Sequence, residues 1–483
     1  MPRSPTLPDP AQSQKRTVLL VATLAAFVTP FMGSSINVAL PSIGKEFALD
    51  AITLSWVSTS YLLTAAMFLV PFGKLADIHG RRRVFTYGVA TYSLASLLSA
   101  LARSDAMLIG ARIVQGIGGA MLFGTGMAIV TSVFPVGERG KALGINVAAV
   151  YLGLSLGPFA GGILTQHLGW RSIFWVNTLL GAVLVVLTMW GLKGEWAEAK
   201  GEKLDWTGSV IYGLTLVAIM YGLSLLPLWS GAVFIVVGVL AAVAFVWWEL
   251  RARHPVLNMS LFRGNIVFGF SNLAALINYS ATFAVGFFLS LYLQYIKGYT
   301  PESAGTILVS QPIVMAILSP YAGRLSDRVE SRIVASAGMA ITVVGLVLLV
   351  FLGPQTPVPY IVTALMVLGL GFALFSSPNS NAVMSAVEKR YYGVASATLG
   401  TMRLVGQMLS MGVAMLIFSI FVGKVEITPE YYGPFLHSIK VAYGVFAAWC
   451  FVGVFVSLAR GNVRGTPNAS GARFDLAHRK QGS

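Results

Sequence analysis

Charged residues are scarce in this sequence. They make up 11% of the 483 residues, whereas about 25% is usual for a soluble protein. Hydrophobic residues reach 56%, which is more than a soluble fold can bury, so we expect lipid to be the solvent. The single cysteine, Cys450, excludes an intramolecular disulfide and a cysteine-based metal cluster. The five histidines are too far apart to form a metal-ligand motif.

Motifs of catalysis are missing as well. The sequence has no phosphate-binding loop of the form GxxxxGK[ST], which argues against direct use of ATP. A membrane-embedded enzyme would need clustered His, Asp or Cys at membrane depth, and a receptor would more naturally carry a signalling domain; we see neither. We therefore expect a protein that is not an enzyme and that holds no metal and no cofactor.

Long hydrophobic stretches dominate what is present. Each is close to or above the roughly 20 residues that an α-helix needs to cross a bilayer, and runs of this length can cross only as helices. The sequence predicts an all-α polytopic membrane protein with fourteen spans, at about 17–39, 51–72, 84–102, 106–132, 142–166, 172–192, 207–227, 230–248, 265–295, 303–322, 333–353, 358–382, 393–421 and 440–459.

The formal net charge of +15 could indicate nucleic acid or a membrane. If both termini are cytoplasmic, 25 of the 33 Lys and Arg residues fall on the cytoplasmic side and 6 on the outer side. This asymmetry is the positive-inside rule. The basic excess therefore reports topology, and we expect a multi-pass protein of the cell (inner) membrane with cytoplasmic termini and no nucleic-acid partner.

An internal repeat organises the chain. GKLAD at Gly73–Asp77 recurs as GRLSD at Gly323–Asp327, after the second and the tenth predicted spans. Two such loops imply two homologous six-helix bundles with two extra helices between them. The predicted domains are an N-terminal tail (1–16), an N-terminal bundle (17–192), a linker with two additional spans (193–264), a C-terminal bundle (265–460) and a C-terminal tail (461–483).

The repeated loop is a candidate conformational latch. Glycine lets helices approach closely, and aspartate can accept hydrogen bonds from a neighbouring helix N-terminus. Arg81, Arg82 and Arg83 could complete the latch or could serve only as anchors among anionic headgroups. The latch residues that we select are Gly73, Asp77, Arg81, Gly323 and Asp327.

These motifs resemble the major facilitator superfamily, and specifically its fourteen-span drug:proton antiporter group. The resemblance covers roughly residues 15–460 and includes RIVQGIGGA (112–120) in the fourth span and GLSLGPFAGG (153–162) in the fifth. NVALPSI (37–43), GWRSIFWVN (169–177), LDWTG (204–208) and HPVLNMSLFRGN (254–265) also fit. The resemblance implies the major facilitator fold and proton-coupled drug export.

The fifth span carries glycine at every fourth residue. Gly153, Gly157 and Gly161 share one helix face, where a partner helix can pack backbone to backbone, and Pro158 removes one helix hydrogen bond. Such a contact would suit a hinge between inward-open and outward-open states. Ordinary tight packing without a moving role is the alternative interpretation.

No carboxylate is expected in the middle of a span. All 18 acidic residues fall in loops, tails or span ends. This departs from the family pattern, since many fourteen-span antiporters carry an aspartate five residues before the position of Asn37, and Met32 stands there instead. A membrane carboxylate commonly carries the proton and balances a cationic drug. Its absence favours neutral or anionic amphiphiles as substrates.

The only ionisable side chains predicted inside the spans are two arginines. Arg112 with Gln115, and Arg403 with Gln407 one turn later, are candidates for coupling or for lining the cavity. Arg112 could instead stiffen the N-terminal bundle by bonding to carbonyl groups of neighbouring helices. Polar residues complete a candidate substrate cavity, although any single polar residue of this kind more often forms an interhelical hydrogen bond than a ligand contact: Asn37, Tyr61, Asn278, Tyr279, Gln311, Asn379 and Asn381.

The sequence thus predicts a secondary active transporter that works by alternating access. It would export lipophilic small molecules, as multidrug efflux proteins do, by proton-coupled antiport implied by the resemblance. The alternative is a lipid or organic-anion carrier that is uncoupled or is coupled through Asp77 and Glu138. Expected partners are a small lipophilic or amphiphilic substrate, protons and membrane lipid, and we expect a monomer.

Overall fold

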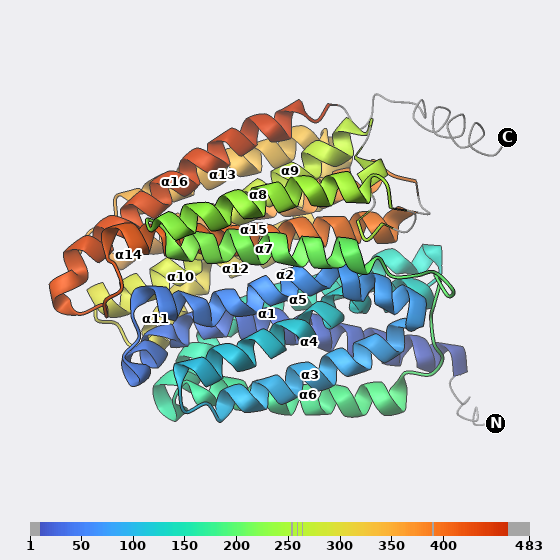
Figure 1. Ribbon diagram of the computed structural model, residues 1–483, viewed down its shortest axis with the longest axis horizontal. Helices are drawn as coiled ribbons and strands as arrows, with labels where there is room; N and C mark the ends of the chain where they lie inside the picture. The colour runs from blue at the N-terminus through green and yellow to red at the C-terminus, as the bar shows by residue number, and fades with distance from the viewer. Residues whose placement is uncertain (1–9, 253–254, 258, 263, 389–390, 462–483) are drawn as a thin grey trace, which may run out of the picture. The chain divides into compact units, whose positions relative to one another are not determined.

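The computed structural model describes residues 10–252, 255–257, 259–262, 264–388 and 391–461. The predicted tails fall largely outside these ranges. Within them the regular structure is entirely helical (Figure 1), as predicted. The first helix, α1, already begins at Pro10, inside the stretch 1–16 that was expected to be a tail. Two contacts hold its first turns: Gln14 Nε2 donates to the carbonyl of Lys193 at 2.7 Å, and Lys15 Nζ lies 2.9 Å from Glu138 Oε2.

The chain divides into two compact units. Unit 1 comprises residues 1–209 and 290–309, and unit 2 comprises residues 210–289 and 310–483. The six long helices and one short helix of unit 1 are α1 (Pro10–Phe47), α2 (Ala51–His79), α3 (Arg81–Ala100), α4 (Asp105–Val133), α5 (Val136–Leu168), α6 (Arg171–Gly191) and α11 (Pro301–Leu308).

Unit 2 begins just after the start of α7 and includes both extra helices. The π-helical turn η2 (Tyr292–Ile296) follows α10 and belongs to unit 1. The helices of unit 2 are α7 (Trp206–Leu225), α8 (Trp229–Glu249), η1 (Met259–Leu261), α9 (Ile266–Thr282), α10 (Ala284–Leu291), α12 (Ser310–Arg328), α13 (Ser331–Val350), α14 (Val358–Ser385), α15 (Tyr392–Phe421), η4 (Pro429–Tyr431) and α16 (Tyr432–Ala459).

The helix pairings repeat between the two units. In unit 1, α1 packs on α5, α2 and α3 pack on α4, and α3 packs on α6. In unit 2, α9 packs on α15, α12 and α13 pack on α14, and α13 packs on α16. The same order of pairings supports the internal repeat that the two GxLxD loops indicate. The short helix α11 departs from this order of pairings, because it packs on α5 inside unit 1.

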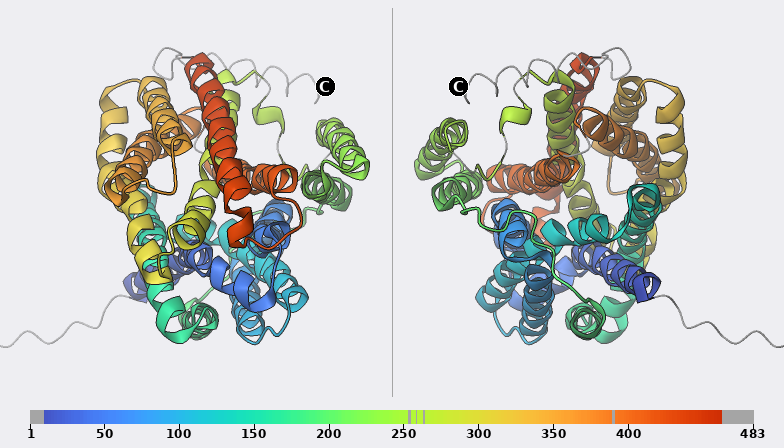
Figure 2. Two further views of the ribbon diagram at one scale, coloured as in Figure 1. Left: turned by 90° about the vertical axis from the view of Figure 1, so that its left-hand side faces the viewer. Right: turned by 90° about the vertical axis from the view of Figure 1, so that its right-hand side faces the viewer.

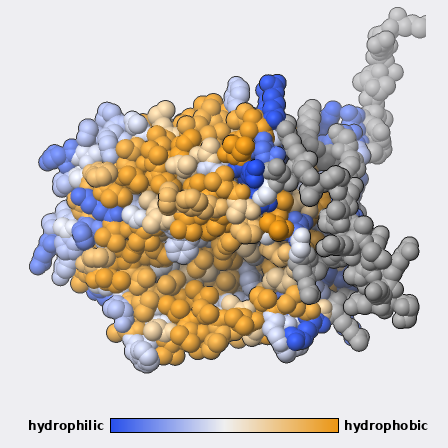
Figure 3. All heavy atoms as spheres, turned by 90° about the horizontal axis from the view of Figure 1, so that it is seen from above, coloured by the Kyte–Doolittle hydropathy of each residue, from blue (hydrophilic) through white to orange (hydrophobic). Residues whose placement is uncertain are grey.

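Thirteen helical segments of the described chain are long and apolar enough to cross a membrane. They match the predicted spans with one exception. The exception is α3, which is long enough for a span at 20 residues but is less apolar than the others. It begins with three arginines and carries several hydroxyl side chains. In the view of Figure 3, hydrophobic side chains cover the middle of the helices and hydrophilic ones gather toward their ends.

Local signals explain where several helices begin. Asp50 caps α2, since its Oδ1 accepts hydrogen bonds from the backbone amides of Ile52 at 2.9 Å and Thr53 at 3.0 Å. Asn265 caps α9 by accepting from the amide of Phe268 at 3.0 Å. Gly80 separates α2 from α3 with a φ of 118°, which a side chain rarely adopts.

The two extra helices lie side by side in both orientations of Figure 2. Glycines allow the contact, because a Cβ on Gly222 of α7 would lie 2.9 Å from the carbonyl oxygen of Gly231 of α8. The chain joins α15 to this pair through Ser419, whose hydroxyl donates to the carbonyl of Leu226 at 2.5 Å. Much of α8 exposes large apolar side chains, among them Val236, Leu240 and Val243, as a lipid-facing helix does.

Candidate functional site

Arg112 braces three helices inside unit 1. It is 1% exposed, and its Nε donates to the carbonyl of Val57 on α2 at 3.0 Å. Its Nη1 donates to Gln115 on the same helix, α4, and Gln115 Nε2 donates to Ser96 Oγ on α3 at 2.7 Å. The guanidinium also lies over the ring of Tyr61, 4.6 Å from its centroid. This arrangement agrees with the interpretation of Arg112 as a stiffening residue.

Two tyrosine hydroxyl groups lie buried in the same interior. Tyr61 and Tyr92 are 6% and 1% exposed, and neither hydroxyl has a hydrogen-bond partner among the described residues. Gly119 faces Tyr61, since a Cβ there would lie 2.8 Å from the hydroxyl oxygen. Tyr61 therefore serves as the aromatic platform for Arg112, and its hydroxyl is available for a ligand or water.

Arg403 has a different environment in unit 2. It is half-buried on α15, and its guanidinium carbon lies 5.1 Å from the centroid of the Tyr279 ring on α9. Within the described chain it makes no hydrogen bond and no ion pair, and its Nε is buried without a partner. Tyr279 is held edge-on against Phe372 of α14, with ring centroids 5.4 Å apart. Arg403 thus carries a charge that no described side chain balances.

Asn278 adjoins this arginine–tyrosine pair in the sequence of α9. It is 0% exposed, and both its side-chain oxygen and its side-chain nitrogen lack a partner in the described structure. Such a group costs free energy unless a ligand or water satisfies it. Gln407 and Gln311 are half-buried on α15 and α12. Arg403 and Asn278 are therefore the predicted cavity residues of unit 2 that have buried polar atoms without a described partner.

Two of the predicted cavity asparagines are already engaged. Asn379 Nδ2 donates to the carbonyl of Ser271 at 3.1 Å, and its Oδ1 accepts from Arg460 Nη1 at 2.8 Å. Asn381 is exposed, and its Nδ2 donates to Ser326 Oγ at 2.9 Å. Both side chains form the interhelical hydrogen bonds that were the alternative interpretation.

Arg460 is a buried charge that the sequence analysis missed. It follows α16 directly, is 0% exposed, and also donates from Nη2 to the carbonyl of Ser331 at 2.8 Å. Burial lowers the pKa of Arg460 to about 10, although nearby Glu330 opposes that change. In the sequence it is one of many basic residues at a span end, and no pattern separates it from an ordinary anchor.

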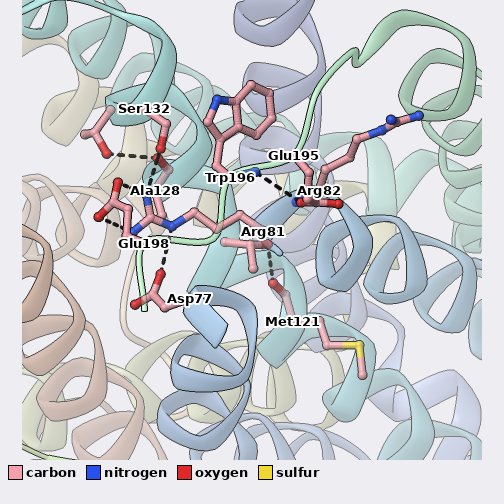
Figure 4. Close-up of polar contacts among 11 residues, drawn as sticks. Asp77, Arg81, Arg82, Met121, Ala128, Ser132, Glu195, Trp196 and Glu198 are labelled. Carbon is pink, nitrogen blue, oxygen red and sulfur yellow. Dashed lines mark hydrogen bonds and ion pairs between the residues drawn. The ribbon is translucent and has the colours of Figure 1, made fainter. Parts of the chain in front are cut away.

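The latch loop, residues 73–83, centres on Arg81. Arg81 Nε lies 2.8 Å from Asp77 Oδ1, and its Nη1 and Nη2 lie 2.7 and 3.0 Å from the two carboxylate oxygens of Glu198 (Figure 4). Arg81 Nη1 also donates to Ser132 Oγ of α4 at 2.7 Å. Burial opposes the charge of Arg81, but the carboxylates of Glu198 and Asp77 outweigh it and raise the pKa.

The contacts of the latch residues differ from those that the sequence predicts. The Asp77 carboxylate accepts from the side chain of Arg81, rather than from the N-terminus of a neighbouring helix. A Cβ on Gly73 would meet open space, so close helix packing does not require glycine there. Arg81 is 7% exposed and paired, which differs from a headgroup anchor. In the repeat, a Cβ on Gly323 would lie 3.0 Å from Ser377 Oγ, and the side chain of Asp327 lies outside the described structure.

The glycine face of α5 packs on α1 as predicted. A Cβ on Gly153 would lie 2.5 Å from the carbonyl oxygen of Phe27, and one on Gly161 would lie 2.8 Å from the Cα of Ser35. Gly157 faces Ser34 and Ser35, and Ser35 Oγ donates to the Gly157 carbonyl at 2.9 Å. α5 continues through Pro158 to Leu168. Side chains at these glycines would force the two helices apart.

Residues 290–309 cover the opposite end of unit 1 from the latch loop. Ser290, 0% exposed, donates to the carbonyl of Asn37 at 2.6 Å, and Gln294 Nε2 donates to the carbonyl of Val38 at 2.9 Å. A Cβ on Gly305 would clash with the carbonyl oxygen of Pro158. Asn37 therefore contributes its backbone to a closed contact between α1 and this segment.

The described residues contain no group of three or more side chains that could hold a metal ion. Acidic side chains of the described chain lie at helix ends or between helices, as Asp50, Asp105 and Glu249 illustrate. Of the two arginines within membrane-length helices, Arg112 is hydrogen-bonded and Arg403 has an aromatic contact alone.

The profile of the Major Facilitator Superfamily matches residues 22–207 and 272–480. The chain belongs to the Major Facilitator Superfamily. The residues between the two matched ranges include α8 and most of α7. Membership makes the protein a multi-pass membrane transporter of the secondary type and not an enzyme.

Curated relatives include drug efflux proteins of the superfamily. The chain is 32% identical over 408 residues to multidrug resistance protein Stp of Mycobacterium tuberculosis, covering 83% of this chain and 75% of Stp. It is 34% identical over 418 residues to cephamycin export protein CmcT of Amycolatopsis lactamdurans, covering 84% and 85%. Riboflavin transporter RibZ of Clostridioides difficile is 28% identical, with 92% and 97% covered.

Two solved transporter structures share the fold. Peptide transporter POT in complex with sulfate superposes with a TM-score of 0.68 at 14% sequence identity, over 94% of this chain and 96% of POT. Nucleoside transporter NupG gives a TM-score of 0.61 at 14% identity, over 92% and 99%. These structures confirm the major facilitator fold, and the sequence relatives confirm the relationship to the fourteen-span drug efflux group that the motifs predicted.

Proposed function

We propose that this protein exports lipophilic small molecules by alternating access, with a preference for neutral or anionic amphiphiles. In alternating access, the substrate site would be open to one side of the membrane at a time. Export by proton antiport is the function most consistent with the drug efflux relatives. The charge asymmetry of the loops supports a cell (inner) membrane orientation with both termini in the cytoplasm.

The observation that carries the preference is the unbalanced charge of Arg403. An arginine keeps its proton in almost any protein environment, and Arg403 has neither a hydrogen bond nor an ion pair among the described residues. A carboxylate, sulfonate or phenolate of a substrate would supply the missing partner. A quaternary ammonium ion would meet repulsion at the same place, because no described acid lies mid-helix to offset it.

Asn278 and Tyr279 would complete the contact with the substrate. Asn278 offers both a donor and an acceptor that nothing in the described chain uses, and Tyr279 offers an aromatic ring already aligned with Arg403. Aromatic rings and a few unsatisfied polar groups are the usual lining of small-molecule sites.

The alternative is a lipid or organic-anion carrier that is not coupled through a membrane carboxylate. The pairing of the loop-edge acids favours it, because Asp77 is bound to Arg81 and Glu138 to Lys15. Neither acid is then free to carry a proton through the membrane in this state. This alternative shares the anion preference but predicts no proton movement.

Transport in proteoliposomes with an imposed pH gradient separates these functions. Purified protein is assayed with ethidium as cation, a neutral lipophilic dye and carboxyfluorescein as anion, with a pH dye on the trans side. Antiport predicts that neutral and anionic probes accumulate with the gradient and that each transported molecule moves protons. Transport without proton movement would support the carrier, and transport of ethidium alone would contradict the proposed preference.

A further inference from the structure

The segment between α6 and α7 is bound to unit 1 along most of its length. We call residues 193–205 the strap. In the strap, the backbone carbonyl of Trp196 accepts from the backbone amide of Arg81 at 2.8 Å. The backbone amide of Ala199 donates to the backbone carbonyl of Asp77 at 2.9 Å. Glu202 Oε2 lies 2.5 Å from Lys74 Nζ. A flexible linker would instead leave these backbone groups to water.

Gly80 makes room for the strap. A Cβ at this position would lie 2.3 Å from the carboxylate carbon of Glu195, and Glu195 Oε1 accepts from the amide of Arg82 at 2.8 Å (Figure 4). The strap therefore places Glu195 and Glu198 on either side of the start of α3. Three of its four acids face Lys74, Arg81 and Arg83, so the charges of strap and latch loop are complementary.

We propose that Glu198 is a positioning residue of the transport cycle, and that the strap holds the latch loop by supplying the carboxylate that fixes Arg81. Glu198 makes two of the four side-chain hydrogen bonds of Arg81, and these join the strap to a residue that also contacts α2 and α4. The chain runs from the strap directly into α7, the first of the two extra helices. Movement of α7 would therefore act on the latch through Glu198.

The second repeat has a contact at the corresponding place. Comparing the two shows why the contact between Glu198 and Arg81 can open. There, the residue after the sixth helix is Arg460, which binds Ser331 at the start of α13 and Asn379 of α14. Arg460 is 0% exposed, so water has no access to replace its partners. The side chain of Glu198 is 67% exposed, and water can solvate it when the ion pair breaks. The first repeat thus has a releasable contact where the second has a fixed one.

A single reporter cysteine measures the effect of this contact. In a Cys450→Ala background, Ser290→Cys places a thiol in the buried contact with α1 at the opposite end of unit 1, so maleimide labelling requires that end to open. The structure shows the strap bound and Ser290 covered together. Glu198→Gln should destabilise this state and raise the labelling rate about fivefold, as expected for losing one charge-assisted contact.

Two further variants separate positioning from general charge effects. Glu198→Asp keeps the carboxylate and should return the rate to within about twofold of the parent, since charge-assisted bonds depend on the ionised partner. Glu138→Gln removes an exposed ion pair to Lys15 that does not touch Arg81, and it should leave the rate unchanged. Equal rates for folded Glu198→Gln and its parent, or equal acceleration by Glu138→Gln, would overturn the proposal.

If Glu198→Gln fails to fold, Glu202→Gln provides the second test. It weakens the strap at Lys74 and should accelerate labelling in the same direction, by about twofold for an exposed pair. An unchanged rate would count against the strap. The proposal rests on alternating access but on no particular substrate, and labelling needs none. Its failure is therefore distinct from a failure of the proposed substrate preference, which only the transport assay reveals.

Discussion

Arg112 of unit 1 and Arg403 of unit 2 both lie within membrane-length helices, and the two differ in what surrounds them. Arg112 in unit 1 has a backbone carbonyl, a glutamine and a tyrosine ring as partners. Arg403 in unit 2 has a tyrosine ring alone. A buried charge without partners is costly, and membrane proteins retain such residues mainly for function. The difference suggests that Arg112 maintains structure and that Arg403 meets the substrate.

The largest expected effect is on stability. Arg112→Met removes the brace between α2, α3 and α4 and should lower the free energy of unfolding by about 3 kcal/mol, because Gln115 loses its buried partner. Arg403→Met should cost less than about 1 kcal/mol, since no hydrogen bond is lost. Thermal unfolding in detergent measures both. Equal losses would remove the contrast between the two arginines.

A carboxylate restored to unit 1 should change substrate selection. Met32 is buried at the position where the antiporter group often carries aspartate. Met32→Asp would balance the cationic interior and should raise ethidium transport about tenfold relative to the parent, because an opposite charge offsets the repulsion of a cation. Met32→Asn is the matched control and should not do so. If ethidium transport stays at the parental level in folded Met32→Asp, the missing acid does not determine selectivity.

Two asparagines of unit 2 give a smaller contrast. Asn278 has no described partner for either amide atom, so Asn278→Leu loses no hydrogen bond and should raise the free energy of unfolding by about 1 kcal/mol by removing an unsatisfied buried amide. Asn379 holds Arg460, and Asn379→Leu should cost about 2 kcal/mol by leaving that charge less well bonded. Thermal unfolding of both variants tests this. A large loss for Asn278→Leu would show that a hidden structural partner exists.

Much of the fold could be predicted from the sequence. Long apolar runs fix helices in lipid, and the recurrence of Gly73–Asp77 at Gly323–Asp327 indicates two repeats. α3 was correctly expected as a helix even though its arginines and hydroxyl groups make it less apolar than the others. The packing of α11 on α5 was not predicted, because hydropathy gives no information about which helices pack together.

The candidate site was predictable in composition but not in pairing. The deep positions of Arg112 and Arg403 followed from hydropathy, whereas their different partners depend on tertiary contacts. The strap illustrates the same limit, since Glu198 is 117 residues away from Arg81 and lies in a polar linker. Arg460 was missed because basic residues commonly end a membrane span. Local sequence does not tell an arginine buried among carbonyl and amide groups from one at the lipid headgroups.

Selectivity of wild type and Arg403→Gln in proteoliposomes is the most direct test. Initial rates are measured for carboxyfluorescein and ethidium under one pH gradient, with Tm as the control for folding. We predict that wild type prefers the anion and that Arg403→Gln lowers anion transport about tenfold while ethidium transport does not fall, as expected for losing one charge-assisted contact. An unchanged ratio of anion to cation transport in folded Arg403→Gln would contradict the central role given to this arginine.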